Sequence, residues 1–198
     1  MMCIIQNVKP ARREVEDMRM SQAEKDKSHA RIVASASRLL RERGVGGASV
    51  SDVMKEAGLT HGGFYKHFAN KDALAESALD SAFATFTATL DGDPSDAAAA
   101  FRVLYLSDGH VRNPGRGCPV PALGPDIGRG SKKLKAAFGR GVDRIVNALA
   151  ESLHGSADAR RAAAFQQFSM LVGAVVIARA SDPQTADEVL SAVSAAVR

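Results

Sequence analysis

The segment from Ser49 to Leu74 constrains the fold of this chain more than any other part of its 198 residues. Its sequence is SVSDVMKEAGLTHGGFYKHFANKDAL, and four apolar residues recur at the spacing of one helix face: Val50, Val53, Met54 and Ala57. Ser49 is a favourable N-cap, and Asp52 suits the positive end of the helix dipole. Gly58 tolerates the left-handed backbone with which helices commonly end. The pattern therefore predicts a helix of about two turns followed by a tight turn.

A second short helix is predicted directly after this turn. Thr60 is expected to cap it, and the helix carries the residues from His61 to Phe68. A longer helix is predicted over residues 22–43, before the segment, with Ile32, Ala36, Leu39 and Leu40 facing inward and Arg31, Arg38 and Arg41 on its polar side. Another helix begins near Lys71. Two short helices joined by a tight turn are the layout of a helix-turn-helix, whose second helix can enter the major groove of DNA.

The residues of this second helix also resemble a known family. The run LTHGGFYKHF from Leu59 to Phe68, followed by NKDAL from Asn70 to Leu74, resembles the DNA-binding signature of the TetR-like transcriptional repressors. The resemblance covers residues 23–81 in detail and the whole chain in length and helical rhythm. Gly63 stands where the family commonly has a hydroxyl residue, so one potential base or phosphate contact is absent here.

The resemblance implies an all-α fold, with an N-terminal three-helix helix-turn-helix DNA-binding unit and a C-terminal helical effector and dimerisation domain. Residues 1–20 are expected to be an extension without regular structure, with a helix from Ala11 to Met20 as the alternative. Residues 21–70 are assigned to DNA binding and residues 71–198 to ligand binding and dimerisation. In the second half we expect helices over residues 95–107, 132–153, 157–180 and 184–197. A loop is expected over 108–118, and a short or broken helix over 119–129 because Pro125 should interrupt it.

The expected DNA contacts follow from the chemistry of this motif. Hydrogen-bond donors reach bases and phosphates, and small residues let the backbone approach the DNA closely. Lys71 resembles the phosphate-contacting lysine of the family, whereas Phe64 and Phe68 should anchor the back face. His61 and His67 have a structural role as the alternative. The full predicted set is Ser49, Ser51, Thr60, His61, Gly62, Gly63, Tyr65, Lys66, His67 and Lys71.

Charge alone does not identify this unit. Residues 21–80 contain 9 Lys or Arg and 8 Asp or Glu, so the segment is nearly neutral, and the whole chain carries a formal charge of +4. Because the helix is short and rich in glycine, phosphate contacts should dominate the affinity, which should fall steeply with salt. A dimer would present two such helices to successive major grooves, and this arrangement predicts a palindromic operator.

Cys118 is the second position where chemistry is expected. It precedes Pro119 and so stands at a predicted N-cap, with Arg112 and Arg116 nearby. A helix N-terminus and basic neighbours both favour the thiolate, and some TetR-like repressors have a sensing cysteine at a similar position. The alternative is a small buried apolar residue. The other candidate effector contacts are Tyr105, His110, Phe101, Phe138 and Gln166.

The last two helices are predicted to form a homodimer. They carry apolar residues with small residues between them that allow close approach, which resembles the four-helix dimer interface of the family. Cys3 and Cys118 do not form a disulfide framework, so a reduced, cytoplasmic location is expected. The N-terminal apolar run is too short for a signal peptide or a membrane span.

The sequence thus predicts a one-component transcriptional regulator, a repressor by resemblance, that a small molecule or a thiol-reactive compound releases from double-stranded DNA. No cofactor is expected, because no nucleotide-binding motif and no His/Cys cluster with metal-ligand spacing occurs. An enzyme is one alternative, with Cys118 and His110 as the only nucleophile–base candidates. An architectural DNA-binding protein without effector control is the other, although the residues after the DNA-binding unit exceed what compact DNA binding needs.

Overall fold

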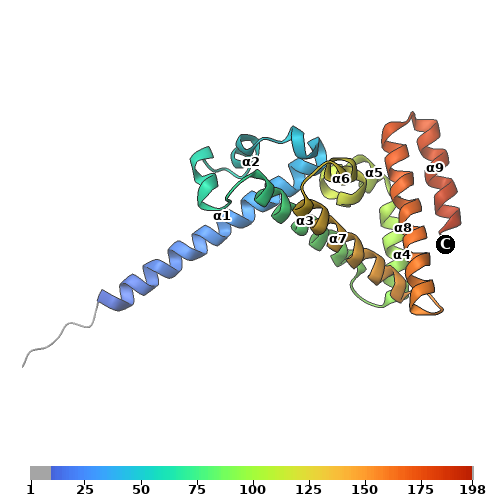
Figure 1. Ribbon diagram of the computed structural model, residues 1–198, viewed down its shortest axis with the longest axis horizontal. Helices are drawn as coiled ribbons and strands as arrows, with labels where there is room; N and C mark the ends of the chain where they lie inside the picture. The colour runs from blue at the N-terminus through green and yellow to red at the C-terminus, as the bar shows by residue number, and fades with distance from the viewer. Residues whose placement is uncertain (1–9, 198) are drawn as a thin grey trace, which may run out of the picture.

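The computed structural model describes residues 10–197, with side chains from Ser21 onward, and every regular element within that range is a helix (Figure 1). The all-α prediction is therefore confirmed. The long helix α1 (Pro10–Gly47) begins within the predicted extension, and residues 1–9 lie outside the described part of the chain. The assignment of residues to domains stays a prediction.

Four helical elements form the N-terminal unit: α1, α2 (Val50–Glu56), the 3₁₀ helix η1 (His61–Lys66) and α3 (Lys71–Thr87). The inward residues predicted on α1 are buried: Ile32, Ala36, Leu39 and Leu40. They pack in one core with Val53 and Met54 of α2, Phe64 of η1 and Leu79 of α3. α1 leaves helical geometry at Gly44, where φ is +78°, a conformation that glycine adopts without strain.

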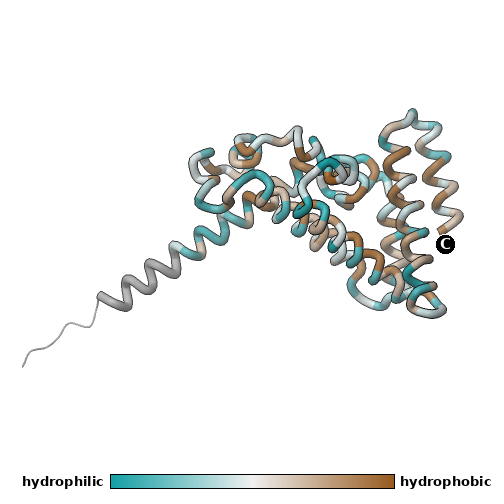
Figure 2. Tube along the Cα trace, viewed as in Figure 1, coloured by the Kyte–Doolittle hydropathy of each residue, from teal (hydrophilic) through white to brown (hydrophobic). Residues whose placement is uncertain are grey.

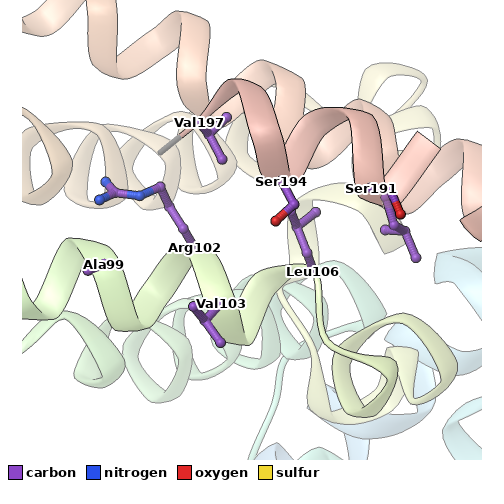
Figure 3. A pocket seen from close by; sticks show the side chains of 8 residues that line it. Ala99, Arg102, Val103, Leu106, Ser191, Ser194 and Val197 are labelled. Carbon is purple, nitrogen blue, oxygen red and sulfur yellow. The ribbon is translucent and has the colours of Figure 1, made fainter. Parts of the chain in front are cut away.

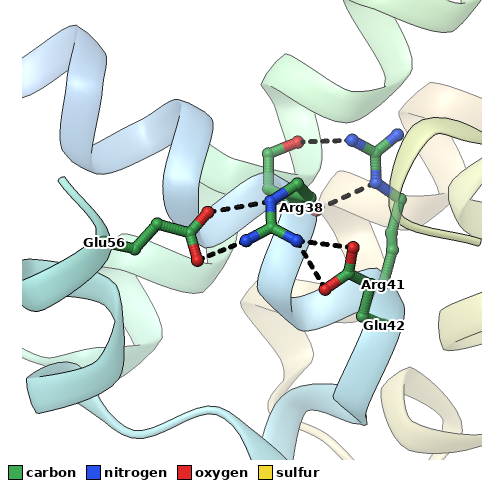
Figure 4. Close-up of polar contacts among 5 residues, drawn as sticks. Arg38, Arg41, Glu42 and Glu56 are labelled. Carbon is green, nitrogen blue, oxygen red and sulfur yellow. Dashed lines mark hydrogen bonds and ion pairs between the residues drawn. The ribbon is translucent and has the colours of Figure 1, made fainter.

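Arg41 corrects the expected polar side of α1. Sequence spacing placed it with Arg31 and Arg38 on the solvated face, but its side chain is buried, with 9% exposed. Its guanidinium donates from Nε to the Ser37 carbonyl (2.9 Å) and from Nη2 to the Ser37 hydroxyl (3.2 Å), contacts drawn in Figure 4. Arg41 can be buried because the C-terminal half of the chain packs over this part of α1, which no local pattern reveals.

The second half of the described chain is built from six helices and two short 3₁₀ turns. These are η2 (Ala88–Leu90), α4 (Pro94–Tyr105), α5 (Asp108–Arg112), η3 (Pro114–Arg116), α6 (Pro119–Gly128), α7 (Lys132–Glu151), α8 (Ala157–Ala180) and α9 (Pro183–Ala196). Side chains of Ser131, Ser156 and Asp182 accept backbone hydrogen bonds at the starts of α7, α8 and α9, which explains why those helices begin there.

One expectation for the middle of the chain was wrong, and another was right only in part. The segment 108–118 is not a loop, because Ser107 caps the short helix α5 and η3 follows it. Helix α6 is short, as one of the two expected forms, but it is not broken, because it continues through Pro125. The residue before a proline normally resists helical geometry because its Cβ meets the proline ring, and Gly124 has no Cβ. Pro125 itself removes one intrahelical hydrogen bond from α6, because proline has no backbone N–H.

Helices α8 and α9 lie side by side at the end of the molecule away from α2 (Figure 1). One face of α8 is buried in the core through Phe168, Leu171 and Val175. By length and composition α8 is the one helix of the described residues that could cross a membrane. Its packing between α7 and α9 and its arginines at positions 160, 161 and 179 fit a helix of a folded bundle instead.

Candidate nucleic-acid interface

A capping box fixes the start of the first helix of the motif. The Ser49 hydroxyl oxygen accepts the Asp52 N–H (3.1 Å), and the Asp52 carboxylate accepts the Ser49 N–H (3.0 Å). The hydrogen bonds from the Ser49 hydroxyl and N–H lower the pKa of Asp52. Because the Ser49 hydroxyl also donates to Asp52 (2.6 Å), it is already engaged in the cap, whereas the exposed Ser51 makes no comparable bond among the described residues.

Gly58 forms the turn, as predicted. Its φ is +67°, and a Cβ at this position would lie 2.5 Å from Nη2 of Arg31. The backbone geometry therefore selects glycine, whereas the Arg31 guanidinium is the end of an exposed side chain that could move aside. The turn leads directly into η1, and η1 carries the predicted DNA-contacting residues on one side of the unit.

The second helix of the motif is a 3₁₀ helix, where an α-helix was expected. Thr60 has the backbone geometry of an N-cap, but its side chain makes no capping hydrogen bond, and the two glycines that follow have low helix propensity. Phe64 is buried and packs against Phe68, with ring centroids 5.8 Å apart, so the predicted back face is confirmed. Tyr65, with 72% exposed, points away from this core.

The donors predicted to reach DNA lie mostly in solvent. Thr60, His61, Gly62, Tyr65 and Lys66 are exposed, and Gly63 is half-buried. A Cβ at Gly62 would meet nothing within 4 Å, and one at Gly63 would make ordinary contacts with Met54 and Thr60. Neither glycine has positive φ, so neither is required by the fold of the described chain. The absence of a side chain at these two positions fits a close approach of DNA to the backbone.

His67 differs from these donors. It is half-buried beside His29 of α1, with ring centroids 5.9 Å apart, and its Nδ1 is buried with no partner among the described residues. Burial, and after it the neighbouring charge of His29, lowers the pKa of His67 below its ordinary value. A neutral imidazole packed between α1 and η1 fits the structural alternative better than a phosphate contact.

The start of α3 places the last predicted contact. The Asn70 side chain accepts the Ala73 N–H (2.9 Å) and caps the helix, and Lys71 occupies the first helical position, half-buried. A lysine at a helix N-terminus stands beside backbone N–H groups that favour anions, so both can act on one phosphate.

Ion pairing explains how a nearly neutral unit can attract DNA. Arg38 joins α1 to α2 by binding Glu42 (2.6 Å) and Glu56, as Figure 4 shows. Glu76 and Asp80 of α3 face Arg140 of α7, at 3.8 Å and 3.6 Å. Arg140 lies outside residues 21–80, so its ion pairs offset acidic charge of the unit, whereas Arg38 and its two glutamates all belong to the unit itself. Lys66 and the exposed Lys55 form no ion pair among the described residues, so the surface near the motif is more basic than its composition.

The candidate effector residues separate into two groups. Phe101, Tyr105, His110 and Cys118 lie together in the core, where the Tyr105 and His110 ring centroids are 4.5 Å apart. Phe138 instead packs edge-on against Phe83 at 5.8 Å, and Gln166 is exposed on α8. Aromatic rings fill the space around Tyr105, and the larger cavities lie at the surface. One of about 680 Å³ separates Arg102 and Val103 of α4 from Ser191 and Ser194 of α9 (Figure 3).

The surroundings of Cys118 fit the alternative of a small buried residue better than a reactive thiol. The residue stands at the N-cap of α6 as predicted, but its side chain is fully buried, and Arg112 and Arg116 are exposed to solvent. Burial raises the pKa of Cys118 to about 11, although Tyr105, Arg41 and Arg179 act in the opposite direction. The desolvation of a thiolate thus exceeds the helix-terminus effect, and the thiol is protonated at neutral pH.

Both ring nitrogens of His110 form hydrogen bonds to backbone groups of this segment. Its Nδ1 donates to the Tyr105 carbonyl (2.5 Å), and its Nε2 accepts the Cys118 backbone N–H (2.9 Å). Burial lowers the pKa of His110 to about 4, so the ring is neutral at pH 7. Neither ring nitrogen is available to take a proton from the thiol.

Two arginines in contact with this segment were not predicted as functional. Arg41 of α1 donates from Nη1 to the Gly117 carbonyl (2.7 Å), and Arg179 of α8 donates to the carbonyls of His110 (2.8 Å) and Val111 (2.9 Å). The only sequence signal is a polar pair at i and i+4, Ser37 and Arg41, beside the apolar stripe of α1.

Comparison with known proteins agrees with this geometry. Residues 32–78 match the family described as bacterial regulatory proteins, tetR family. A relative is the HTH-type transcriptional regulator TtgR of Pseudomonas putida, 36% identical over 64 residues, which are 32% of this chain and 30% of that protein. The chain thus matches about a third of the length of this curated relative. The matched segment is similar to the DNA-binding part of TetR-family regulators, and it contains the helix-turn-helix.

Solved structures extend the likeness in fold to most of the chain. A TetR-family regulator from Cytophaga hutchinsonii covers 88% of this chain and 94% of its own, with a TM-score of 0.72 and 20% identity. The reduced form of E. coli NemR covers 86% and 95%, with a TM-score of 0.71 and 20% identity. AibR, crystallised with isovaleryl coenzyme A and operator DNA, covers 86% and 97%, with a TM-score of 0.59 and 15% identity.

Proposed function

We propose that this protein is a one-component transcriptional regulator, a repressor, that binds a palindromic operator in double-stranded DNA as a homodimer. The observation that carries the proposal is the division of η1 into two sides. Phe64 is buried on one side, while Thr60, Tyr65 and Lys66 stand in solvent on the other, beside two glycines that the fold does not require. Such a regulator acts in the bacterial cytoplasm.

The surface of α8 and α9 supports the homodimer. Phe165, Met170, Val176 and Ile177 of α8 are large apolar side chains that are 38% to 46% exposed, and the apolar character of this helix is visible in Figure 2. The neighbouring surface of α9 presents small residues: Ser191, Ala192, Ala195 and Ala196. An apolar stripe beside a surface of small residues suits close helix packing in a four-helix interface.

A small molecule is better supported as the effector than a thiol-reactive compound. Cys118 is buried and protonated, so an electrophile would first need a local opening of the structure. The crystal structure of AibR with isovaleryl coenzyme A and operator DNA shows that one protein of this fold binds a small molecule and DNA. No effector is identified for this chain by its residues.

The rival classes are less well supported. A thiol enzyme needs a base beside its nucleophile, and both nitrogens of His110 are bonded to the backbone. An architectural DNA-binding protein would leave the helices from α4 to α9 without a role. Saturable binding of a small molecule that lowers operator affinity would separate the regulator from this second rival.

The test is a fluorescence-anisotropy titration against the DNA flanking the gene, at two salt concentrations. Lys66→Ala should weaken binding and reduce the slope of log Kd against log salt by about 1, because one phosphate contact is lost. Lys133→Ala removes an exposed lysine from α7 and is the matched control. Equal affinity and slope for both variants and the parent would refute the proposed interface.

A further inference from the structure

The boundary between the two halves of the chain contains a pair of arginines that bind one backbone segment. Arg41 comes from α1 in the N-terminal unit, and Arg179 comes from α8 in the C-terminal half. Arg41 donates to the Gly117 carbonyl, while Arg179 donates to the carbonyls of His110 and Val111. We call these two side chains and their three carbonyl acceptors the carbonyl clamp. The segment that it holds, residues 110–118, connects α5 to α6.

Both guanidinium groups of the clamp are without a carboxylate partner. Arg41 is buried and Arg179 half-buried, yet neither forms an ion pair with any described residue. A desolvated cation bound only by carbonyl groups and a hydroxyl is a poor source of stability. Such an arrangement is more readily explained if the position of the carbonyl groups matters for function.

The clamped segment has little freedom to move while the clamp is closed. A Cβ at Gly117 would lie 2.5 Å from Cδ2 of His110, so the backbone and the imidazole are in direct contact. The imidazole is itself held between the Tyr105 carbonyl and the Cys118 N–H. A displacement of the end of α4 or of α5 would therefore move Gly117 and its carbonyl.

α1 is held against α6 near the clamp by one further hydrogen bond. The Asp126 carboxylate accepts the Val45 N–H (2.8 Å) at the point where α1 leaves helical geometry. Gly115 of η3 also lies directly against the Glu42 side chain. Glu42 touches this segment at Gly115, whereas Arg41 donates a hydrogen bond from α1 to the segment that Arg179 binds from the other side. Arg41 therefore connects the DNA-binding unit to α8 through one stretch of backbone.

We propose that Arg41 is the residue that couples the two domains, because its hydrogen bond to Gly117 holds α1 in the position that binds DNA. An effector that shifts residues 110–118 breaks this bond and frees α1. The proposal rests on the proposed function, since it names the regulation of the same DNA-binding unit. By linkage, DNA must then stabilise the closed clamp as much as the closed clamp favours DNA.

The native thiol provides a probe that needs no known effector. Cys118 follows Gly117 directly, is fully buried, and is the only thiol after Cys3→Ser, because the chain has two cysteines. Its alkylation by iodoacetamide therefore reports how often residues 110–118 open. The rate would be measured by mass spectrometry in the Cys3→Ser protein, alone and with a duplex that this protein selects from a randomised DNA library.

Arg41→Met in the Cys3→Ser protein should raise the alkylation rate of Cys118 about tenfold or more, as expected for the loss of a charge-assisted hydrogen bond. The selected duplex should slow alkylation of the parent about threefold or more and should have no effect on Arg41→Met. Arg43→Met removes an exposed arginine from the same helix and should behave as the parent. Arg41→Lys keeps the charge and one donor, so its alkylation rate should lie between those of the parent and Arg41→Met. This variant also controls for misfolding of Arg41→Met.

Two results would overturn the inference. Equal alkylation rates in Arg41→Met, Arg41→Lys and the parent would show that Arg41 does not hold the segment. Faster alkylation with the effect of DNA retained would show that Arg41 holds the segment but does not couple it to DNA. Failure to select any duplex would refute the proposed function instead, and the rates without DNA would still decide whether Arg41 holds residues 110–118.

Discussion

The two glycines of η1 allow the requirements of the fold to be separated from those of DNA binding. A Cβ at Gly62 would enter open space, and one at Gly63 would lie 3.5 Å from Met54 and 3.9 Å from Thr60. Neither residue has positive φ. Replacing either by alanine should therefore stabilise the protein by about 0.4–1 kcal/mol, because the unfolded chain loses conformational freedom. For a chain of this length the corresponding rise in Tm is about 1–4 °C.

Operator binding should become weaker in the same two variants, although their stability increases. If DNA approaches the backbone at Gly62, a methyl group there displaces it, and the loss of one contact costs about 1–3 kcal/mol, or at least about fivefold in Kd. Thermal unfolding followed by circular dichroism and anisotropy titration would measure both quantities on the same Gly62→Ala and Gly63→Ala proteins.

Gly139→Ala is the matched control for this pair. Gly139 is an exposed helical glycine of α7 whose Cβ would also meet nothing within 4 Å, so alanine should stabilise the protein and leave Kd unchanged. A lower Tm for Gly62→Ala would mean that η1 needs glycine for its own backbone. An unchanged Kd would mean that DNA does not approach this residue, and either result would refute the reasoning.

Three further outcomes are expected. Phe64→Ala should destabilise the protein by about 3–5 kcal/mol, since the ring is 1% exposed, and chemical denaturation would show a smaller effect if η1 were not part of the core. The free energy of unfolding should fall as the pH drops from about 6.5 towards 4, because burial keeps His110 neutral in the folded protein while the unfolded chain takes up a proton. The loss is at most about 3 kcal/mol. His110→Asn should remove this part of the pH dependence. Ile177→Asp should give a folded monomer by light scattering, because it places a charge on the exposed apolar face of α8, and an intact dimer would exclude this face as the interface.

Local chemistry made the DNA-binding unit predictable. The spacing of Ser49 and Asp52 specifies a capping box within four residues, and Gly58 supplies the one backbone conformation that the turn requires. The apolar period of α1 and the cap residues before α7 and α8 likewise act over one or two turns of helix. Interactions of this range depend on residues that are close in sequence. The sequence therefore determined the order of the helices and the buried side of the motif.

The tertiary structure decided which polar groups meet solvent. Arg41 follows the apolar stripe by one residue and was expected on the surface, but η3 and α6 pack over it. Cys118 has the local setting of a reactive thiol, yet the folded chain buries it completely beside Tyr105 of α4. Desolvation depends on atoms that are distant in sequence, and it outweighs the local effects of a helix end or a neighbouring charge. The sequence by itself therefore determined that this chain builds a helix-turn-helix on an all-helical frame, and only the folded arrangement decided that Cys118 is protonated and that Arg41 joins the two halves.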